Sequence, residues 1–350
     1  MLCPLLIAGP ATATPNMIRL GYPQCQSCHL TPQGGGLLTS YGEGIDLAQT
    51  LRPREPDTPE FGEDELGSRL NYDARLSLGI DREPPSGATY GFNTSLRAAA
   101  GFMNHRIVYS AGIRSPTLAR SRTSGAVSIS MSRLYWLYQP KKGLSFIVGR
   151  DDLPSGLTGL QSFSRRVNNP SVSQTPTQAK VFWWNDRWQV TAYGYGPDGI
   201  ETDRQFRARG GGAVVGANVW RDRAVVGVTT RVSKSDAFDR TNAGVFARWG
   251  ITEHWGILAE HDVTQRTTAI GQDITHLAGR TEVFYVPLDW LQTALSIDHV
   301  TTSGGDDTVR FSPSADIRLT SNIKLGFGID HVHTPVESRT YSFELQVKTN

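Results

Sequence analysis

Cys25, Cys28 and His29 are the residues whose types and spacing carry the most specific chemistry in this chain. Cys-x-x-Cys-His is the attachment signature of a c-type haem. Two thiols at this spacing can each bond one vinyl group of a single porphyrin, and the adjacent imidazole then lies where it can bind the iron as proximal ligand. The sequence therefore predicts one covalent haem c, with His29 as the metal ligand.

Other chemistries of a Cys-x-x-Cys pair fit this sequence less well. A redox dithiol would be expected within a βαβ pattern, whereas the flanks here contain Pro and Gly. A zinc site would need a second pair of ligands, and no cysteine follows Cys28 in the chain. A disulfide between the two cysteines and a chance match to the motif stay open as alternatives.

The second axial ligand of the iron is not defined by the motif. Met17 is the local candidate, and Met103 and His105 are candidates from the later part of the chain. Two of these have an ordinary alternative. Met17 can belong to an apolar collar with Ile18 and Leu20, and His105 can be a surface residue in a turn.

Several other polar residues could contribute to a site. His331 and His333 share one face of a strand end and could bind a metal at the rim, or they could simply lie at a loop edge. Arginines that fall on the polar face of alternating segments could pair with haem propionates, although an ordinary wall of mixed charge is the alternative. These arginines are Arg75, Arg97, Arg231 and Arg248.

Residues 14–51 are expected to form a small head that carries the haem. A Gly-rich segment follows the motif, and we expect one short helix against a haem face, with Gly42 and Gly44 allowing close approach to the ring. A head of about 40 residues is too small to bury a haem alone, so another part of the chain must cover it. The helix is predicted by apolar residues at helical spacing, namely Leu37, Leu38, Tyr41, Ile45 and Ala48.

Residues 1–13 have the features of a signal peptide that is short at its front. Residues 5–8 form an apolar core and Ala11-Thr12-Ala13 fits a cleavage site. Because haem c is attached outside the cytoplasm, an exported protein is what the haem motif also predicts.

The balance of 35 basic and 33 acidic residues argues against a nucleic-acid partner. No apolar run reaches about 18 residues, which argues against a transmembrane helix but leaves a β-barrel open.

From residue 67 to 350 the hydrophobic period changes to two, after a Pro-rich, charged linker at 52–66. Between Leu70 and Ile80, for example, apolar and polar residues alternate, so one face of the segment is apolar. Longer polar stretches at 156–178, 197–212 and 233–241 fall between pairs of such segments, as in outer-membrane barrels. Tight turns within the pairs are expected at 140–143, 185–186, 221–222, 252–253, 287–288 and 321–322.

About 16 strands are expected, an even number as single-chain bacterial barrels require. A soluble β-sandwich also alternates, but these strands are longer than those of soluble sheets, and Trp and Tyr lie near strand ends. The expected fold is therefore all-β, a transmembrane antiparallel β-barrel. The expected strands are 67–81, 88–103, 105–115, 124–139, 143–150, 177–185, 187–196, 209–220, 223–233, 239–250, 254–266, 275–286, 288–301, 308–319, 322–333 and 339–349. The aromatic residues concerned include Trp220, Trp249, Trp255, Tyr285 and Trp290.

The haem motif followed by a barrel of this length resembles the fused outer-membrane monohaem cytochrome–porins, a family implicated in iron(II) oxidation. The resemblance is carried by Cys25, Cys28 and His29 and by the segment 37–42, with its aliphatic, polar and aromatic-Gly order. In the head the resemblance rests on the sequence motif, whereas in the barrel it rests only on the alternating pattern of apolar and polar residues. The chain is shorter than typical members of the family, and its segment 32–36 is Gly-rich where theirs is not.

The resemblance implies that the head plugs the lumen of the barrel and that the polar inner wall completes the haem pocket. It also implies electron transfer at the cell outer membrane, of the iron(II):cytochrome oxidoreductase type. The partners would be outer-membrane lipid, an extracellular donor such as iron(II), and a periplasmic electron-carrier cytochrome. A methionine ligand, which raises the reduction potential, suits such a donor. Two other functions stay open: a transport porin with a haem-bearing plug, and the barrel subunit of a multihaem cytochrome conduit.

Overall fold

The computed structural model describes residues 15–29, 37–51, 69–81, 87–114, 118–119, 128–154, 156–157, 176–197, 208–236, 238–305, 307–334 and 338–348. The expected signal peptide at 1–13 and the expected linker at 52–66 lie outside these residues. No helix in the described ranges is long and apolar enough to cross a membrane.

The described part of the head contains three short helical segments: 3-10 helices η1 (Pro15–Leu20) and η2 (Cys25–Ser27), and helix α1 (Ser40–Ala48). The Thr39 hydroxyl caps α1 by accepting a hydrogen bond from Gly42 N at 3.0 Å, which satisfies one of the free N–H groups of the first turn. The expected short helix is confirmed. Leu37 and Leu38 precede it, and Leu38 forms a β-bridge with His29.

The strands of the described residues form one antiparallel sheet of seventeen strands, of which β4 has only 2 residues. The strands are β1 (Arg69–Asp81), β2 (Gly87–Phe102), β3 (His105–Arg114), β4 (Leu118–Ala119), β5 (Ser128–Lys141), β6 (Leu144–Arg150), β7 (Thr177–Trp184), β8 (Trp188–Gly196), β9 (Arg209–Trp220), β10 (Ala224–Lys234), β11 (Phe238–Gly250), β12 (Trp255–Thr268), β13 (Asp273–Leu288), β14 (Leu291–Thr302), β15 (Thr308–Thr320), β16 (Ile323–His333) and β17 (Ser338–Lys348).

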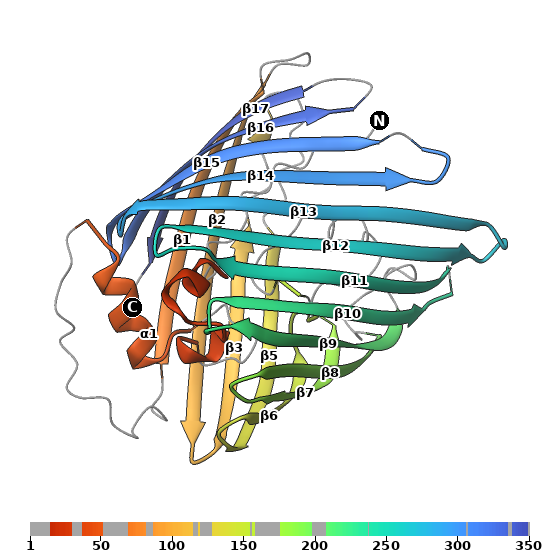
Figure 1. Ribbon diagram of the computed structural model, residues 1–350, viewed down its shortest axis with the longest axis horizontal. Coiled ribbons are helices and arrows are strands. Elements are labelled where there is room, and N and C mark those ends of the chain that lie inside the picture. Colours follow the sequence, from red (N-terminus) through yellow and green to blue (C-terminus); the bar gives the residue numbers. More distant parts are fainter. Residues whose placement is uncertain are drawn as a thin grey trace.

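Every long strand pairs with a neighbour on both sides. The long strands pair in chain order; β4 pairs with β2, and β3 pairs directly with β5. β1 pairs with β2 along one edge and with β17 along the other. The sheet therefore curves back on itself around an interior, which we call the lumen (Figure 1).

The strands expected from the sequence correspond to β1–β3 and β5–β17, with small differences at their ends. The tight turn expected at 140–143 is confirmed between β5 and β6, although Pro140 itself belongs to β5. The turn expected at 287–288 is wrong, because Pro287 belongs to β13 and the turn lies at 289–290. Each proline lies at a shift of register, between Tyr138 and Lys141 in β5 and between Tyr285 and Leu288 in β13. A residue without an N–H donor is tolerated at such an irregularity, so these prolines do not end their strands.

Polar side chains of the sheet face the interior and apolar side chains face outward, the reverse of the arrangement in a soluble protein. In β12, Glu260 and Thr264 face the lumen with exposed fractions of 1% and 0%, whereas the apolar Val263 between them is 43% exposed on the outer face. The same alternation occurs in β11, where Val245 is 57% exposed. An apolar outer face around a polar interior is the pattern of a barrel that lies in lipid.

Aromatic residues cluster on the outer face next to the tight turns. Trp220 lies 5.8 Å from Trp249, and Trp255 stacks on Tyr285 at 4.3 Å, measured between ring centroids. Such girdles mark the level of the lipid headgroups. The tight turns, including 221–223, 251–254 and 321–322, define one end of the barrel, which we call the tight-turn end; the opposite end is the long-loop end.

Candidate functional site

The Cys-x-x-Cys-His motif is folded as one compact turn. Cys28 N and His29 N both donate hydrogen bonds to Cys25 O, at 3.2 and 3.0 Å. The thiols of Cys25 and Cys28 are not joined in a disulfide. Burial raises the pKa of the Cys28 thiol to about 11, with a smaller contribution from Cys25, so that this thiol is protonated at neutral pH. The turn brings both thiols and the imidazole to one place in the head.

His29 is buried, with an exposed fraction of 5%. Neither ring nitrogen makes a hydrogen bond of normal geometry within the part of the chain that the structure describes. Burial lowers the pKa of His29 to about 4, opposed by the Leu37 backbone, while the positive charges of Arg97 and Arg133 lower it further. The imidazole is therefore neutral at physiological pH, which is the form that binds a metal ion.

The segment after the motif packs closely on it. Thr39 N donates to Cys28 O at 2.9 Å. A Cβ atom added to Gly42 would lie 2.1 Å from Cys28 O, whereas one added to Gly44 would meet nothing within 4 Å. Gly42 thus lies close to the Cys28 backbone, and the close approach to a haem ring expected of the two glycines stays a prediction.

Two tyrosines beside the motif form a pair that the sequence analysis missed. The hydroxyl groups of Tyr22 and Tyr41 are hydrogen-bonded to each other, and their rings meet edge to face at 5.9 Å between centroids. The hydrogen bond to Tyr22 and burial raise the pKa of Tyr41 to about 12. The two residues are distant along the chain, so no local spacing could have indicated the pair.

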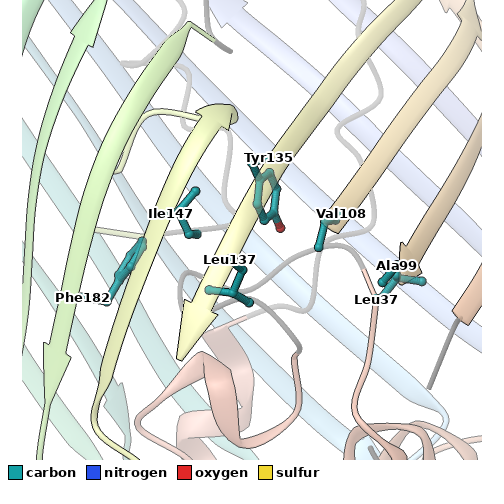
Figure 2. Close-up of a cluster of buried hydrophobic side chains, with 7 residues drawn as sticks. All are labelled: Leu37, Ala99, Val108, Tyr135, Leu137, Ile147 and Phe182. Atoms are coloured by element: carbon teal, nitrogen blue, oxygen red, sulfur yellow. The ribbon is translucent and has the colours of Figure 1, made fainter. Parts of the chain in front are cut away.

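Apolar side chains line the lumen where the head lies. Leu37 of the head belongs to a buried cluster with inward side chains of β2, β3, β5, β6 and β7, and Figure 2 shows Leu37 beside Ala99 of β2. Ile18 of η1 belongs to a second cluster with side chains of β10 to β13. These apolar patches are unusual for the wall of a water-filled barrel, and the head covers them. The other members of the first cluster are Val108, Tyr135, Leu137, Ile147 and Phe182.

Polar contacts fix the head to the tight-turn end of the barrel. Gln24 Nε2 donates to Asn185 O at 2.8 Å, in the turn between β7 and β8, and Gln189 Nε2 donates to Pro23 O at 3.0 Å. The Arg19 guanidinium donates to Glu253 O in the turn between β11 and β12.

Helix α1 is held at the same end of the barrel (Figure 1). Asp46 forms ion pairs with Arg318 Nη1 at 3.4 Å and with Lys348 Nζ at 2.5 Å. Leu51 N donates to Arg318 O at 2.8 Å. The last residues of β15 and β17 therefore hold the C-terminal end of the head.

The structure separates the candidates for the second iron ligand. Met17 lies in the head, where its Sδ accepts a hydrogen bond from Gln49 Nε2 at 3.4 Å. Met103 is 65% exposed in the turn between β2 and β3. His105 is exposed, stacks on Tyr138 at 4.7 Å between ring centroids and accepts a hydrogen bond from Trp136 Nε1. Among the three candidates, only Met17 belongs to the head with the motif.

The arginines expected on the polar face have different surroundings. Arg97 is close enough to His29 to affect its titration. Arg248 Nη2 donates to Gln189 Oε1 at 3.1 Å, and Gln189 in turn holds the head. Arg231 belongs to another part of the lumen, and the side chain of Arg75 lies outside the described residues.

His331, one of the two histidines expected at the rim, makes an ordinary contact. His331 Nδ1 accepts a hydrogen bond from Arg339 Nε at 2.9 Å, and the two residues are cross-strand partners in β16 and β17. Over the described ranges, no group of three or more His, Cys, Asp or Glu side chains could hold a metal ion. A metal site at the rim thus gains no support from these contacts.

A segment after β6 turns into the lumen, which the sequence analysis did not anticipate. Gly156 N donates to Glu260 Oε1 of β12 at 3.0 Å, and Leu157 is completely buried in the cluster that contains Ile18. The start of the segment, directly after β6, is held by a buried ion pair between Lys180 Nζ and Asp151 Oδ2 at 2.9 Å. Leu157 of this inward segment and Ile18 of the head therefore pack in the same buried cluster.

No family model and no curated protein sequence matches the chain. Several solved structures share its fold. The anion-selective porin from Comamonas acidovorans superposes with a TM-score of 0.64 at 10% identity, over 81% of this chain and 99% of the porin. Outer-membrane expressed OmpT of Vibrio cholerae has a TM-score of 0.60 at 11% identity, over 83% of this chain and 100% of OmpT.

The outer membrane channel DcaP of Acinetobacter baumannii superposes with a TM-score of 0.58 at 11% identity, over 83% of this chain and 100% of DcaP. At these identities the likeness concerns the fold alone. The fold is thus that of the porin-like outer-membrane barrels. The apolar outer face and the aromatic girdle of this chain support the same location, the outer membrane.

Proposed function

We propose that this protein carries one covalent haem c at Cys25 and Cys28 inside a porin-like outer-membrane barrel and takes part in electron transfer there. The observation that carries the proposal is the environment of His29, whose buried ring nitrogens lack ordinary hydrogen-bond partners among the described residues. Buried polar atoms without a partner cost free energy, and a bound metal would satisfy one of the two nitrogens.

The residues around the motif fit a haem. Cys25 and Cys28 would hold it by thioether bonds, His29 would bind the iron, and Met17 is the proposed second ligand. When bound, the group supplies one-electron transfer. The apolar wall around Leu37 excludes water from the neighbourhood of His29. Arg97, whose positive charge acts on His29, is the candidate partner for a propionate group.

The head is proposed to plug the lumen at the tight-turn end. Its contacts with Asn185, Glu253, Arg318 and Lys348 support this position. Since bacterial outer-membrane barrels have their short turns on the periplasmic side, the haem would lie near the periplasm. A periplasmic cytochrome could then exchange electrons with it, while an extracellular donor such as iron(II) would enter from the long-loop end.

A transport porin with a haem-bearing plug is the second candidate, and the fold shared with an anion-selective porin and an outer-membrane channel favours it. The two functions differ in what the lumen does. A transport porin conducts ions with the head in place, whereas a plugged electron carrier conducts few. The third alternative, a barrel subunit of a multihaem conduit, requires that separate cytochromes purify with the protein.

The test measures haem and conductance on one preparation of the full chain, exported in cells that attach haem c. The electron-transfer proposal expects a haem that stays on the protein after denaturation, is absent from Cys25→Ser/Cys28→Ser, and is reduced by iron(II). It also expects low ion conductance in planar lipid bilayers. A stable open conductance in the haem-loaded protein would favour transport. A protein without covalent haem from such cells would overturn the proposal.

A further inference from the structure

A row of polar side chains crosses neighbouring strands near the long-loop end of the lumen. Direct cross-strand pairing joins Tyr195 of β8 to Gly210 of β9, Gly210 to Ser233 of β10, Ser233 to Arg240 of β11, and Arg240 to Arg266 of β12. Tyr195, Ser233 and Arg240 are buried. The row therefore directs hydroxyl and guanidinium groups from several strands into one region.

Gly210 keeps the middle of this row open. A Cβ atom at this position would lie 2.2 Å from Val232 O and 2.8 Å from Tyr195 Oη. The Tyr195 hydroxyl therefore occupies the space above the glycine, between β8 and β10. A larger residue would displace that hydroxyl from the row.

Several hydrogen-bonding groups of this region have no partner among the described residues. The buried atoms concerned are Tyr195 Oη, Ser233 Oγ, Arg266 Nε and Arg231 Nε. Arg231 lies on β10 two residues before Ser233, so it is a diagonal neighbour of Arg240. All four groups can donate hydrogen bonds, and the two arginine nitrogens can only donate. Such a set fits a ligand rich in acceptor atoms.

The positive charges in this region are close together. Arg240 and Arg266 are directly opposite in the sheet, and their guanidinium groups lie 5.1 and 4.9 Å from the ring centroid of Phe238. Like charges in directly opposite positions destabilise a sheet. In the described portion of the chain, neither Arg231 nor Arg266 has a carboxylate within ion-pair distance. A bound anion would remove this repulsion.

Other arginines of the lumen differ in this respect. Arg280 pairs with Glu282 at 2.5 Å, and Arg310 pairs with Asp298 at 2.8 Å. Both belong to the neighbouring part of the same wall, on β13 and β15. Among the described residues, Arg231 of β10 and Arg266 of β12 thus differ from these paired arginines.

We propose that Tyr195, Ser233, Arg231, Arg240 and Arg266 form a binding site for a small polyvalent oxyanion that enters from the long-loop end. Planar guanidinium groups bind phosphate and carboxylate oxygens in pairs, and the two hydroxyls supply further donors. With the head at the opposite end, the site lies in a vestibule that retains the anion. The site itself does not depend on the haem.

The test is isothermal titration calorimetry on the full-length protein in detergent, at low ionic strength and neutral pH. Inorganic phosphate and citrate are the polyvalent probes, and chloride is the monovalent control. The proposal expects saturable binding of at least one polyvalent probe at concentrations where chloride does not compete. Absence of saturable binding by both probes would overturn the site, whether or not haem is attached.

Three variants locate the binding. Arg240→Gln/Arg266→Gln should weaken it at least tenfold, and Tyr195→Phe, which keeps the ring, should weaken it by a smaller factor. Arg221→Gln, in a tight turn at the other end, is the matched control and should bind as the unchanged protein does. Heat-dependent mobility on gels checks that each barrel is folded. If the double variant does not fold, the single variant Arg266→Gln replaces it. Equal affinity of the folded variants and the unchanged protein would refute the assignment.

Discussion

Asp46 of the head and Arg318 of β15 form an ion pair at 3.4 Å although they are 272 positions apart in the chain. Asp46 also pairs with Lys348. These contacts join the N-terminal head to strands from the C-terminal part of the barrel. The attachment of the head to the barrel therefore depends in part on the charges of these side chains, each of which a single substitution can remove.

Asp46→Asn should loosen the head without unfolding the barrel. Partly exposed ion pairs contribute about 0.2–1 kcal/mol each, so the population with a displaced head should rise a few-fold. Hydrogen exchange of residues 40–48 should become faster, and ion conductance should increase. Asp316→Asn, which breaks the 2.9 Å pair with Lys324 at the same end of the barrel, is the control. Equal exchange rates in both variants would contradict a role for Asp46.

Gly42→Ala should disturb the haem motif, because its added Cβ atom would lie 2.1 Å from Cys28 O. Overpacking of this kind costs about 1–3 kcal/mol. Gly44→Ala, on the same helix, meets nothing within 4 Å and should be neutral or stabilising by about 0.4–1 kcal/mol. Haem content and protease resistance of the head, measured on both variants, should fall only for Gly42→Ala. A loss in both would show that the helix tolerates no alanine at all.

The Tyr22–Tyr41 hydrogen bond predicts an alkaline transition of the head. Because the pKa of Tyr41 is raised to about 12, the stability that this tyrosine contributes is complete below its ordinary pKa of about 10 and is lost as pH rises through about 12. Tyr22→Phe should move the titration of Tyr41 back toward about 10. Ultraviolet difference spectra report the phenolate, and Tyr41→Phe identifies its step. An unchanged titration in Tyr22→Phe would contradict this assignment.

Val245→Lys tests the lipid contact of the outer face. Val245 is 57% exposed on β11, and a lysine in the middle of an apolar band costs about 2–4 kcal/mol when the barrel is folded in lipid. Ile270→Lys, at an 88% exposed position in the turn between β12 and β13, should be nearly neutral. Unfolding by urea in phospholipid vesicles measures both. A neutral Val245→Lys would mean that this face does not lie in hydrocarbon.

The strands were predictable from the sequence because the period of two extends over each whole strand. Apolar Val263 between Glu260 and Thr264 is an example of a local pattern that fixes a face. Pro287 misled the prediction of its turn, since a bulge can accommodate a proline that local rules assign to a turn. The haem stays a prediction of the Cys-x-x-Cys-His motif, whose chemistry depends on residues that are adjacent in the sequence.

Contacts between distant segments could not be predicted in the same way. The hydrogen bond from Gly156 to Glu260 joins positions 104 apart, and the facing positions of Arg240 and Arg266 depend on the register between two strands. A single sequence gives the face of each residue but not its neighbour across the sheet. For this reason the inward segment and the row of donors emerged only from the structure.

The most direct test of the central claim is the intact mass of the mature protein purified from outer membranes of cells that attach haem c. We expect a mass that exceeds the mass of the polypeptide by one haem, and the loss of this increment in Cys25→Ser/Cys28→Ser. A polypeptide of unmodified mass, inserted in the outer membrane and folded as a barrel, would contradict the claim.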